Sequence, residues 1–100
     1  MSSERIIPER ELNEMIDKAA KEALHSNLTL QAFRSNMKNQ IKEIYQLPAE
    51  MQEDAYAQLM VEEHELEEAN EEKQAYLEGL HQYHWEYYLG PLYELYSKMK

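Results

Sequence analysis

Apolar residues recur every three or four positions along most of the chain, which is the spacing of one face of an α-helix. One such stripe runs through residues 8–25 and a second through 29–46. Between them, Ser26 and Asn27 are poor helix formers, and Thr29 is a residue type that commonly caps a helix N-terminus. The pattern therefore predicts two separate helices, 8–25 and 29–46.

The next stretch, 48–89, predicts one long helix or two helices with a break near Asn70. Unbroken, it would span about 60 Å at 1.5 Å per residue, which exceeds the size of a compact domain of this length. A glycine and a proline, Gly90 and Pro91, follow it and predict its end. We expect a short last helix over 91–99 that folds back on the segment before it.

The fold class that these elements indicate is all-α. The chain contains only two Gly and three Pro, and it has no Asn-Gly or Asp-Gly hairpin turn. We expect one domain over 1–100, built as an elongated helical bundle of three to five helices after a flexible stretch at 1–7. Because a chain this short buries a limited share of its surface, we also expect a dimer.

Charge changes this picture, because it is concentrated on the predicted long helix. Residues 50–78 contain eleven acidic side chains and one basic one, Lys73, whereas positive and negative charges balance in both flanking segments. The net charge of −10 therefore lies on this helix. We expect its densest part to bind a basic partner, through Glu62, Glu63, Glu65, Glu67, Glu68, Glu71 and Glu72.

A basic stripe on the second predicted helix offers another use for those carboxylates. It consists of Arg34, Lys38 and Lys42. If the chain reverses tightly before the acidic helix, Arg34 lies near Glu62 or Glu63 and Lys42 lies near Asp54. We favour this internal pairing over a nucleic-acid surface, because phosphate binding needs clustered positive charge.

Seven of the ten aromatic residues lie between Tyr76 and Tyr96. Tyrosine and tryptophan are enriched at protein interfaces, where they bury large areas and keep a polar end. They can equally fill the core of a single chain, and both interpretations remain open. The residues that we expect at an oligomer interface are Leu77, Leu80, Tyr83, Trp85, Tyr87 and Tyr88.

A metal site is the main alternative from another functional class. Glu78 and His81 have the Glu-x-x-His spacing of carboxylate-bridged metal sites in helical bundles, and His84 lies one turn further on. A homodimer would be needed to complete the ligand set, and the spacing arises easily by chance in a glutamate-rich chain. We therefore expect no cofactor.

The remaining sequence features argue against catalysis. The chain has no cysteine, no glycine-rich phosphate loop and no nucleophile motif. It also lacks an apolar run of membrane-spanning length and a signal peptide pattern, so we expect a cytoplasmic protein that binds neither membranes nor nucleic acid directly. The expected function is protein–protein interaction, as a small regulator or inhibitor of the kind that bacteriophages use. A purely structural or chaperone subunit is a further alternative.

Overall fold

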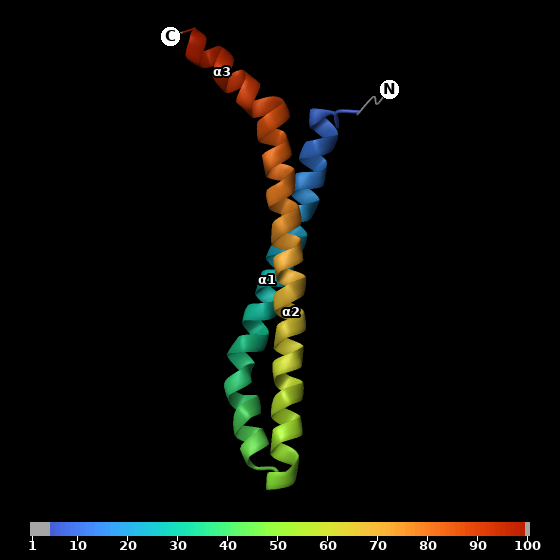
Figure 1. The fold of residues 1–100 in the computed structure, drawn as a ribbon, viewed down its shortest axis with the longest axis vertical. Helices are drawn as coiled ribbons and strands as arrows, with labels where there is room; N and C mark the ends of the chain where they lie inside the picture. Colours follow the sequence, from blue (N-terminus) through green and yellow to red (C-terminus); the bar gives the residue numbers. More distant parts are fainter. Residues whose placement is uncertain (1–4, 100) are drawn as a thin grey trace.

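Two long helices form an antiparallel hairpin in the computed structural model, which describes residues 5–99 (Figure 1). Helix α1 covers Glu9–Tyr45 and helix α2 covers Ala49–His84. A π-helical segment, η1, follows at Trp85–Leu89, and α3 covers Gly90–Lys98. The described residues contain no strand, so the all-α prediction is confirmed.

The shape is a rod rather than a bundle. The Cα radius of gyration is 21.7 Å and the principal extents are 71 × 37 × 19 Å. A compact domain of this length has a radius of gyration of about 13 Å. The expected elongation is therefore confirmed, but the expected bundle of three to five helices does not form, because only α1 and α2 pack along their lengths.

The predicted break between 8–25 and 29–46 is wrong, because α1 runs through it without interruption. Ser26 and Asn27 are helical and partly buried. Thr29 does not cap a new helix, since its Oγ1 donates a hydrogen bond of 2.9 Å to the carbonyl oxygen of His25 one turn earlier. The acidic helix is therefore the second long helix of the chain and not the third.

A seven-residue repeat explains this continuity. Two sets of positions spaced by seven alternate along the inner face of α1, as in a coiled coil, and all of them are buried or partly buried. They are Leu12, Ala19, Ser26 and Phe33 in one set, and Ile16, Ala23, Leu30, Met37 and Ile44 in the other. Ser26 thus occupies a packing position, and the burial of its neighbours outweighs its weak helix propensity.

Helix α2 also continues past the predicted break near Asn70. Gln74 Nε2 donates to Asn70 Oδ1 at 3.3 Å and to the carbonyl oxygen of Ala23 on α1 at 3.1 Å. These contacts attach the middle of α2 to α1, so Asn70 serves the seam between the helices rather than starting a new helix.

The hairpin turn occupies residues 46–48. Pro48 disfavours helical geometry in the residue before it, and its own backbone is extended at φ −55° and ψ 142°. Gln52 Nε2 then donates to the carbonyl oxygens of Tyr45 at 3.3 Å and Leu47 at 3.0 Å. The first turn of α2 thereby satisfies carbonyl groups that the end of α1 leaves without helical partners.

The helical path changes hydrogen-bonding pattern before Pro91. Proline has no N–H and its ring excludes the carbonyl oxygen one turn earlier, so the chain widens into η1, where the N–H of Gly90 donates to the oxygen of Trp85. A Cβ on Gly90 would lie 2.9 Å from that oxygen, so the close approach requires glycine. The helical path therefore continues through Gly90 and Pro91 instead of ending there.

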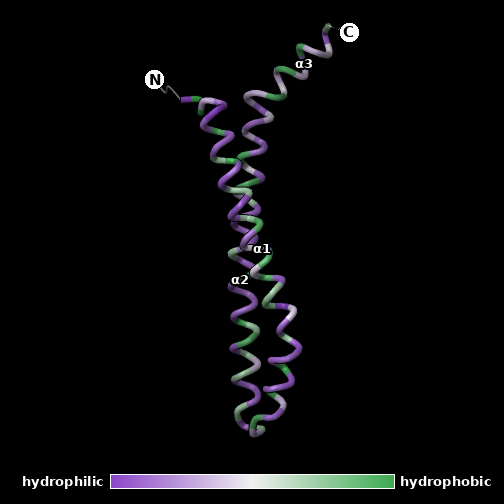
Figure 2. Tube along the Cα trace, turned by 180° about the vertical axis from the view of Figure 1, so that it is seen from behind, coloured by the Kyte–Doolittle hydropathy of each residue, from purple (hydrophilic) through white to green (hydrophobic). Residues whose placement is uncertain are grey.

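Helix α3 projects away from the hairpin instead of folding back as expected (Figure 1). Its main contacts are with η1, the segment that it directly follows. Figure 2 shows apolar residues interspersed with polar ones along both long helices and continuing onto α3. The apolar residues of α3 therefore lie outside the hairpin core.

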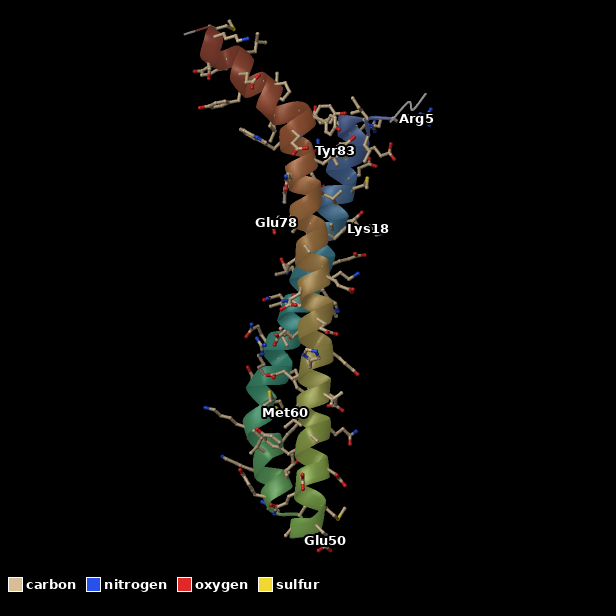
Figure 3. The ribbon with its side chains drawn as sticks, in the orientation of Figure 1. Arg5, Lys18, Glu50, Met60, Glu78 and Tyr83 are labelled. Atoms are coloured by element: carbon tan, nitrogen blue, oxygen red, sulfur yellow. The ribbon has the colours of Figure 1, made fainter. Side chains whose placement is uncertain are left out.

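The best-buried cluster lies toward the open end of the hairpin. Leu12, Ala19 and Leu80 form its centre, and Tyr83 and Tyr88 pack against it. Figure 3 shows Tyr83 near the end of α2, beside the N-terminal part of α1. No helix among residues 5–99 is both long and apolar enough to span a lipid bilayer.

We predict that Leu12→Ala destabilises the hairpin by about 2–5 kcal/mol, because Leu12 is 0% exposed and its truncation leaves a cavity. Leu24→Ala is the matched control on the same helix, where the side chain is 61% exposed, and it should cost less than about 0.5 kcal/mol. Urea unfolding followed by circular dichroism measures both. Equal losses in the two variants would contradict the core described above.

Candidate functional site

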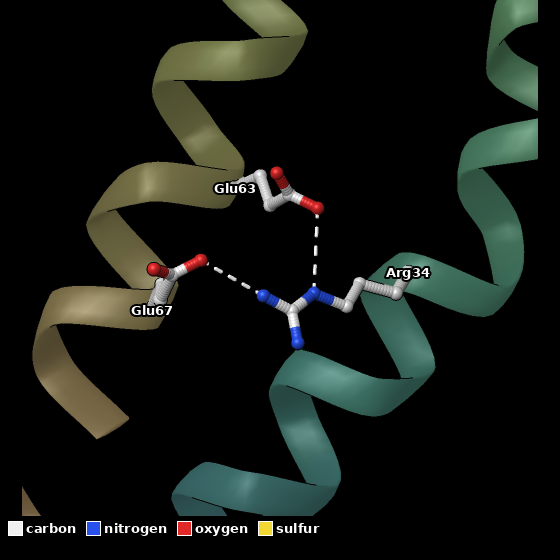
Figure 4. Close-up of polar contacts among 3 residues, drawn as sticks. All are labelled: Arg34, Glu63 and Glu67. Atoms are coloured by element: carbon white, nitrogen blue, oxygen red, sulfur yellow. Dashed lines mark hydrogen bonds and ion pairs between the residues drawn. The ribbon is translucent and has the colours of Figure 1, made fainter. Parts of the chain in front are cut away.

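The acidic segment of α2 divides into an inner and an outer set of glutamates. Arg34 of α1 binds the inner pair: its Nε donates to Glu63 Oε2 at 3.3 Å and its Nη2 to Glu67 Oε2 at 2.8 Å (Figure 4). Both carboxylates are only partly exposed. They link α2 to α1 through Arg34, so their charges are paired within the chain.

The other five expected partner-binding residues are exposed and form the outer set. They are Glu62, Glu65, Glu68, Glu71 and Glu72. Glu68 lies 3.0 Å from Nε2 of His64 in an exposed pair on the same helix. Because α2 is continuous here, it presents these carboxylates at helical spacing, within about three turns of one another.

The predicted internal pairing of the basic stripe is met at one position. Arg34 reaches Glu63, one of the two residues expected for it, and also Glu67. Within residues 5–99, neither Lys38 nor Lys42 forms a salt bridge, so the expected approach of Lys42 to Asp54 produces no ion pair. These two lysines are exposed on the outside of α1.

A second ion pair across the hairpin was not expected from the sequence. Lys73 Nζ of α2 lies 3.6 Å from Glu22 Oε2 of α1. It borders a cleft of about 500 Å³ between the helices, which Lys21, His25 and Leu66 also line. Two of the three charged side chains that line this cleft, Glu22 and Lys73, are therefore already paired with each other.

The expected aromatic interface divides in the same way as the acidic segment. Leu80 is buried in the core of its own chain, and Leu77, Tyr83 and Tyr88 pack against that core. Trp85 and Tyr87 are exposed instead. Four of the six residues expected at an oligomer interface therefore serve the hairpin itself.

Two tyrosines fasten the N-terminal segment to the end of α2. The N–H of Ile7 donates to Tyr83 Oη at 2.9 Å, and Tyr88 Oη donates to the carbonyl oxygen of Ile7. The expected flexibility of 1–7 stays a prediction, although both backbone polar groups of Ile7 are hydrogen-bonded in this clasp. Residues 1–4 lie outside the described residues.

The surroundings of Tyr88 raise the pKa of its phenol above the ordinary value of 10.0. Loss of hydration is the largest cause, followed by the neighbouring Tyr83 and by the negative charge of Glu9. The phenol therefore stays protonated and remains a donor to Ile7. Glu9 also lies 3.0 Å from Nε2 of His84, which adds a polar contact between α1 and α2 beside the clasp.

The candidate metal ligands are not brought together. Glu78 and His81 are exposed on α2, whereas His84 faces α1 and contacts Glu9. Among residues 5–99, no three or more histidine or acidic side chains are grouped so that they could hold a metal ion. Glu78 and His81, which have the Glu-x-x-His spacing, are therefore exposed surface residues of this helix.

The end of the chain presents an exposed apolar surface, whereas the sequence predicts a last helix that folds back and covers its apolar side. We call residues 85–99, which comprise η1 and α3, the arm. Eight large apolar side chains of the arm are exposed, and they are Trp85, Tyr87, Leu89, Leu92, Tyr93, Leu95, Tyr96 and Met99. Their helical spacing was visible in the sequence, but the direction that η1 gives to α3 was not.

No protein-family model, curated protein or solved structure matches this chain. The outer glutamates of α2 and the exposed arm are therefore the features from which a function can be inferred.

We predict that Tyr83→Phe speeds hydrogen exchange at the amide of Ile7, because the variant removes the acceptor of that N–H. Tyr76→Phe is the control, since Tyr76 is an exposed tyrosine of the same helix. Amide exchange followed by nuclear magnetic resonance measures the effect. Unchanged protection of Ile7 in Tyr83→Phe would contradict the clasp.

The raised pKa of Tyr88 gives a pH dependence of definite sign. A phenol with a folded-state pKa above its unfolded value stabilises the fold below pH 10.0, and it loses that contribution as pH rises through the folded value. We predict that the wild type melts at a higher temperature than Tyr88→Phe at neutral pH. This advantage should vanish as Tyr88 ionises, and melting curves over the alkaline range measure it. An advantage independent of pH would contradict the assignment.

Proposed function

We propose that this protein is a non-enzymatic regulator or inhibitor that binds a partner protein with a basic surface through the outer glutamates of α2. The observation that supports it is the division of the acidic segment. Arg34 pairs with Glu63 and Glu67 within the hairpin, while Glu62, Glu65, Glu68, Glu71 and Glu72 face solvent. The exposed negative charge thus exceeds what the hairpin needs for its own pairing.

The rigidity of the rod supports recognition as well as attraction. Glu65, Glu68 and Glu72 follow one another at spacings of three and four, so they share one side of α2. A row of fixed charges loses little conformational freedom on binding, and its field speeds the encounter with a basic surface. The same charge repels phosphate groups, which argues against direct binding of nucleic acid.

The proposed regulator is a homodimer and acts in the cytoplasm. A dimer would offer two acidic faces, so that a repetitive or dimeric basic partner would be held with increased avidity. A cytoplasmic location suits a chain without cysteine, which gains nothing from an oxidising compartment.

We predict that reversing four outer glutamates abolishes partner binding while leaving the helix content unchanged. The variant carries Glu62→Lys, Glu65→Lys, Glu68→Lys and Glu72→Lys, and it retains the two carboxylates that Arg34 binds. Each reversal adds two charges, so the net charge changes from −10 to −2. The measurement is capture of proteins from an extract of the native cells by the immobilised chain, with elution by increasing salt.

The control reverses four exposed acids of α1 and reaches the same net charge. It carries Glu11→Lys, Glu14→Lys, Asp17→Lys and Glu43→Lys. We expect the wild type and this control to retain the same partner, with elution at moderate salt, and the α2 variant to lose it. Equal capture by both variants would show that the outer glutamates do not bind the partner. Equal loss in both variants would show that binding depends only on the total charge of the chain.

A further inference from the structure

Helix α3 lies outside the hairpin and most of the arm is exposed, although Tyr88 of the arm packs against the hairpin core. Leu92 is 61% exposed and Met99 is 79% exposed, although both are residue types that cores normally take up. Trp85 and Tyr93 lie against each other along one side of the arm, with ring centroids 6.1 Å apart. An apolar helix directed away from its own core is a surface for association.

The apolar stripe of α3 has a spacing that suits pairing with itself. It consists of Leu92, Leu95, Tyr96 and Met99, at relative positions 0, 3, 4 and 7. These positions are symmetric about the midpoint between Leu95 and Tyr96. A second copy related by a twofold axis through that midpoint would place Leu92 opposite Met99 and Leu95 opposite Tyr96, as a self-complementary contact requires.

The area on offer agrees with a modest dimer. Eight large side chains that are 40–79% exposed present on the order of 1,000 Å² of apolar surface, since a buried aromatic residue covers about 150–250 Å². One helix face carries about half of this. Two copies would then bury about 1,000 Å² in total, which is the lower limit for a specific interface.

Charge favours the arm over the hairpin as the place where copies meet. The arm contains Glu86, Glu94 and Lys98 and so carries a net charge of −1, whereas the rest of the chain carries −9. Contact between two acidic hairpins would be opposed by repulsion of like charges. Contact between two arms, each with a net charge of only −1, keeps the acidic hairpins apart and reduces this cost.

We propose that the arm is the dimer interface of this protein, and that α3 pairs antiparallel with α3 of a second copy. The inference specifies the homodimer of the proposed function and does not depend on the acidic face. It also moves the interface from the residues expected in the sequence to Leu92, Leu95, Tyr96 and Met99. Leu77 and Leu80 remain within the hairpin core.

Light scattering at tens of micromolar protein gives the first test. The wild type should have twice the mass of one chain, whereas Leu95→Lys should be monomeric with its helix content retained, because α3 lies outside the core. Leu24→Lys is the control: it places the same charge on an exposed leucine of α1 and should remain dimeric. A monomeric wild type, or a dimeric Leu95→Lys, would overturn the proposal.

Cysteine cross-linking tests the direction of pairing, and the absence of native cysteine makes the chemistry selective. Leu92→Cys and Met99→Cys chains are oxidised separately and as a mixture. Antiparallel pairing predicts a covalent dimer in the mixture and little in either variant alone. Covalent dimers in both separate variants would show parallel pairing and would overturn the antiparallel interface.

The result can be separated from failure of the proposed function. Leu95→Lys leaves the outer glutamates of α2 in place, so it should still capture a basic partner, with weaker retention where two acidic faces acted together. Loss of the dimer with capture retained identifies the arm as a self-association element. If Leu95→Lys and the wild type have equal mass, the arm is not the dimer interface, whether or not the outer glutamates bind a partner.

Discussion

The seam between α1 and α2 is the constraint on which the rest of the structure depends. Its seven-residue repeat keeps the inner face of α1 against α2 for the full length of the hairpin. Ala19 and Ala23 are buried there, and their small side chains allow the two helices to approach closely. Because only two helices share the seam, every apolar residue off the inner face remains at the surface. The exposed arm and the exposed glutamates follow from the same geometry.

The composition of the seam determines where the hairpin is held most firmly. Its middle part on α2 contains Glu63 and Asn70, which are partly buried and bonded to Arg34 and Gln74. Its open end contains the buried apolar cluster around Leu12 and the clasp between Ile7 and two tyrosines. Polar contacts of this exposed kind contribute little net stability, whereas apolar burial contributes more. The tyrosines near the end of α2 are therefore first a means of closing a two-helix core.

Sequence reasoning succeeded where one helix face decides the outcome, and it failed where distant packing or backbone hydrogen bonding decides. The helical class, the elongation and the contact of Arg34 with Glu63 follow from spacing and charge. The break predicted at Ser26 and Asn27 is wrong, because their local propensity favours a break while the seven-residue repeat across them favours a continuous helix. The direction of α3 depends on the π-helical turn before Pro91, and side-chain periodicity carries no information about that turn. The same turn places α3 away from the hairpin, so that its apolar side chains are exposed while Tyr83 and Tyr88 pack against the core.

Distance along the rod makes the two exposed surfaces electrostatically independent. Glu72 and Trp85 are separated by 13 residues of helix, which corresponds to about 20 Å at 1.5 Å per residue. The Debye length at physiological ionic strength is about 8 Å, so the field of the outer glutamates is largely screened at the arm. The arm, with a net charge of only −1, can therefore associate with little repulsion from the acidic segment of its own chain. Conversely, a partner bound at the glutamates need not disturb the arm. A chain of two long helices thus separates a charged surface from an apolar one by more than two Debye lengths along its own axis.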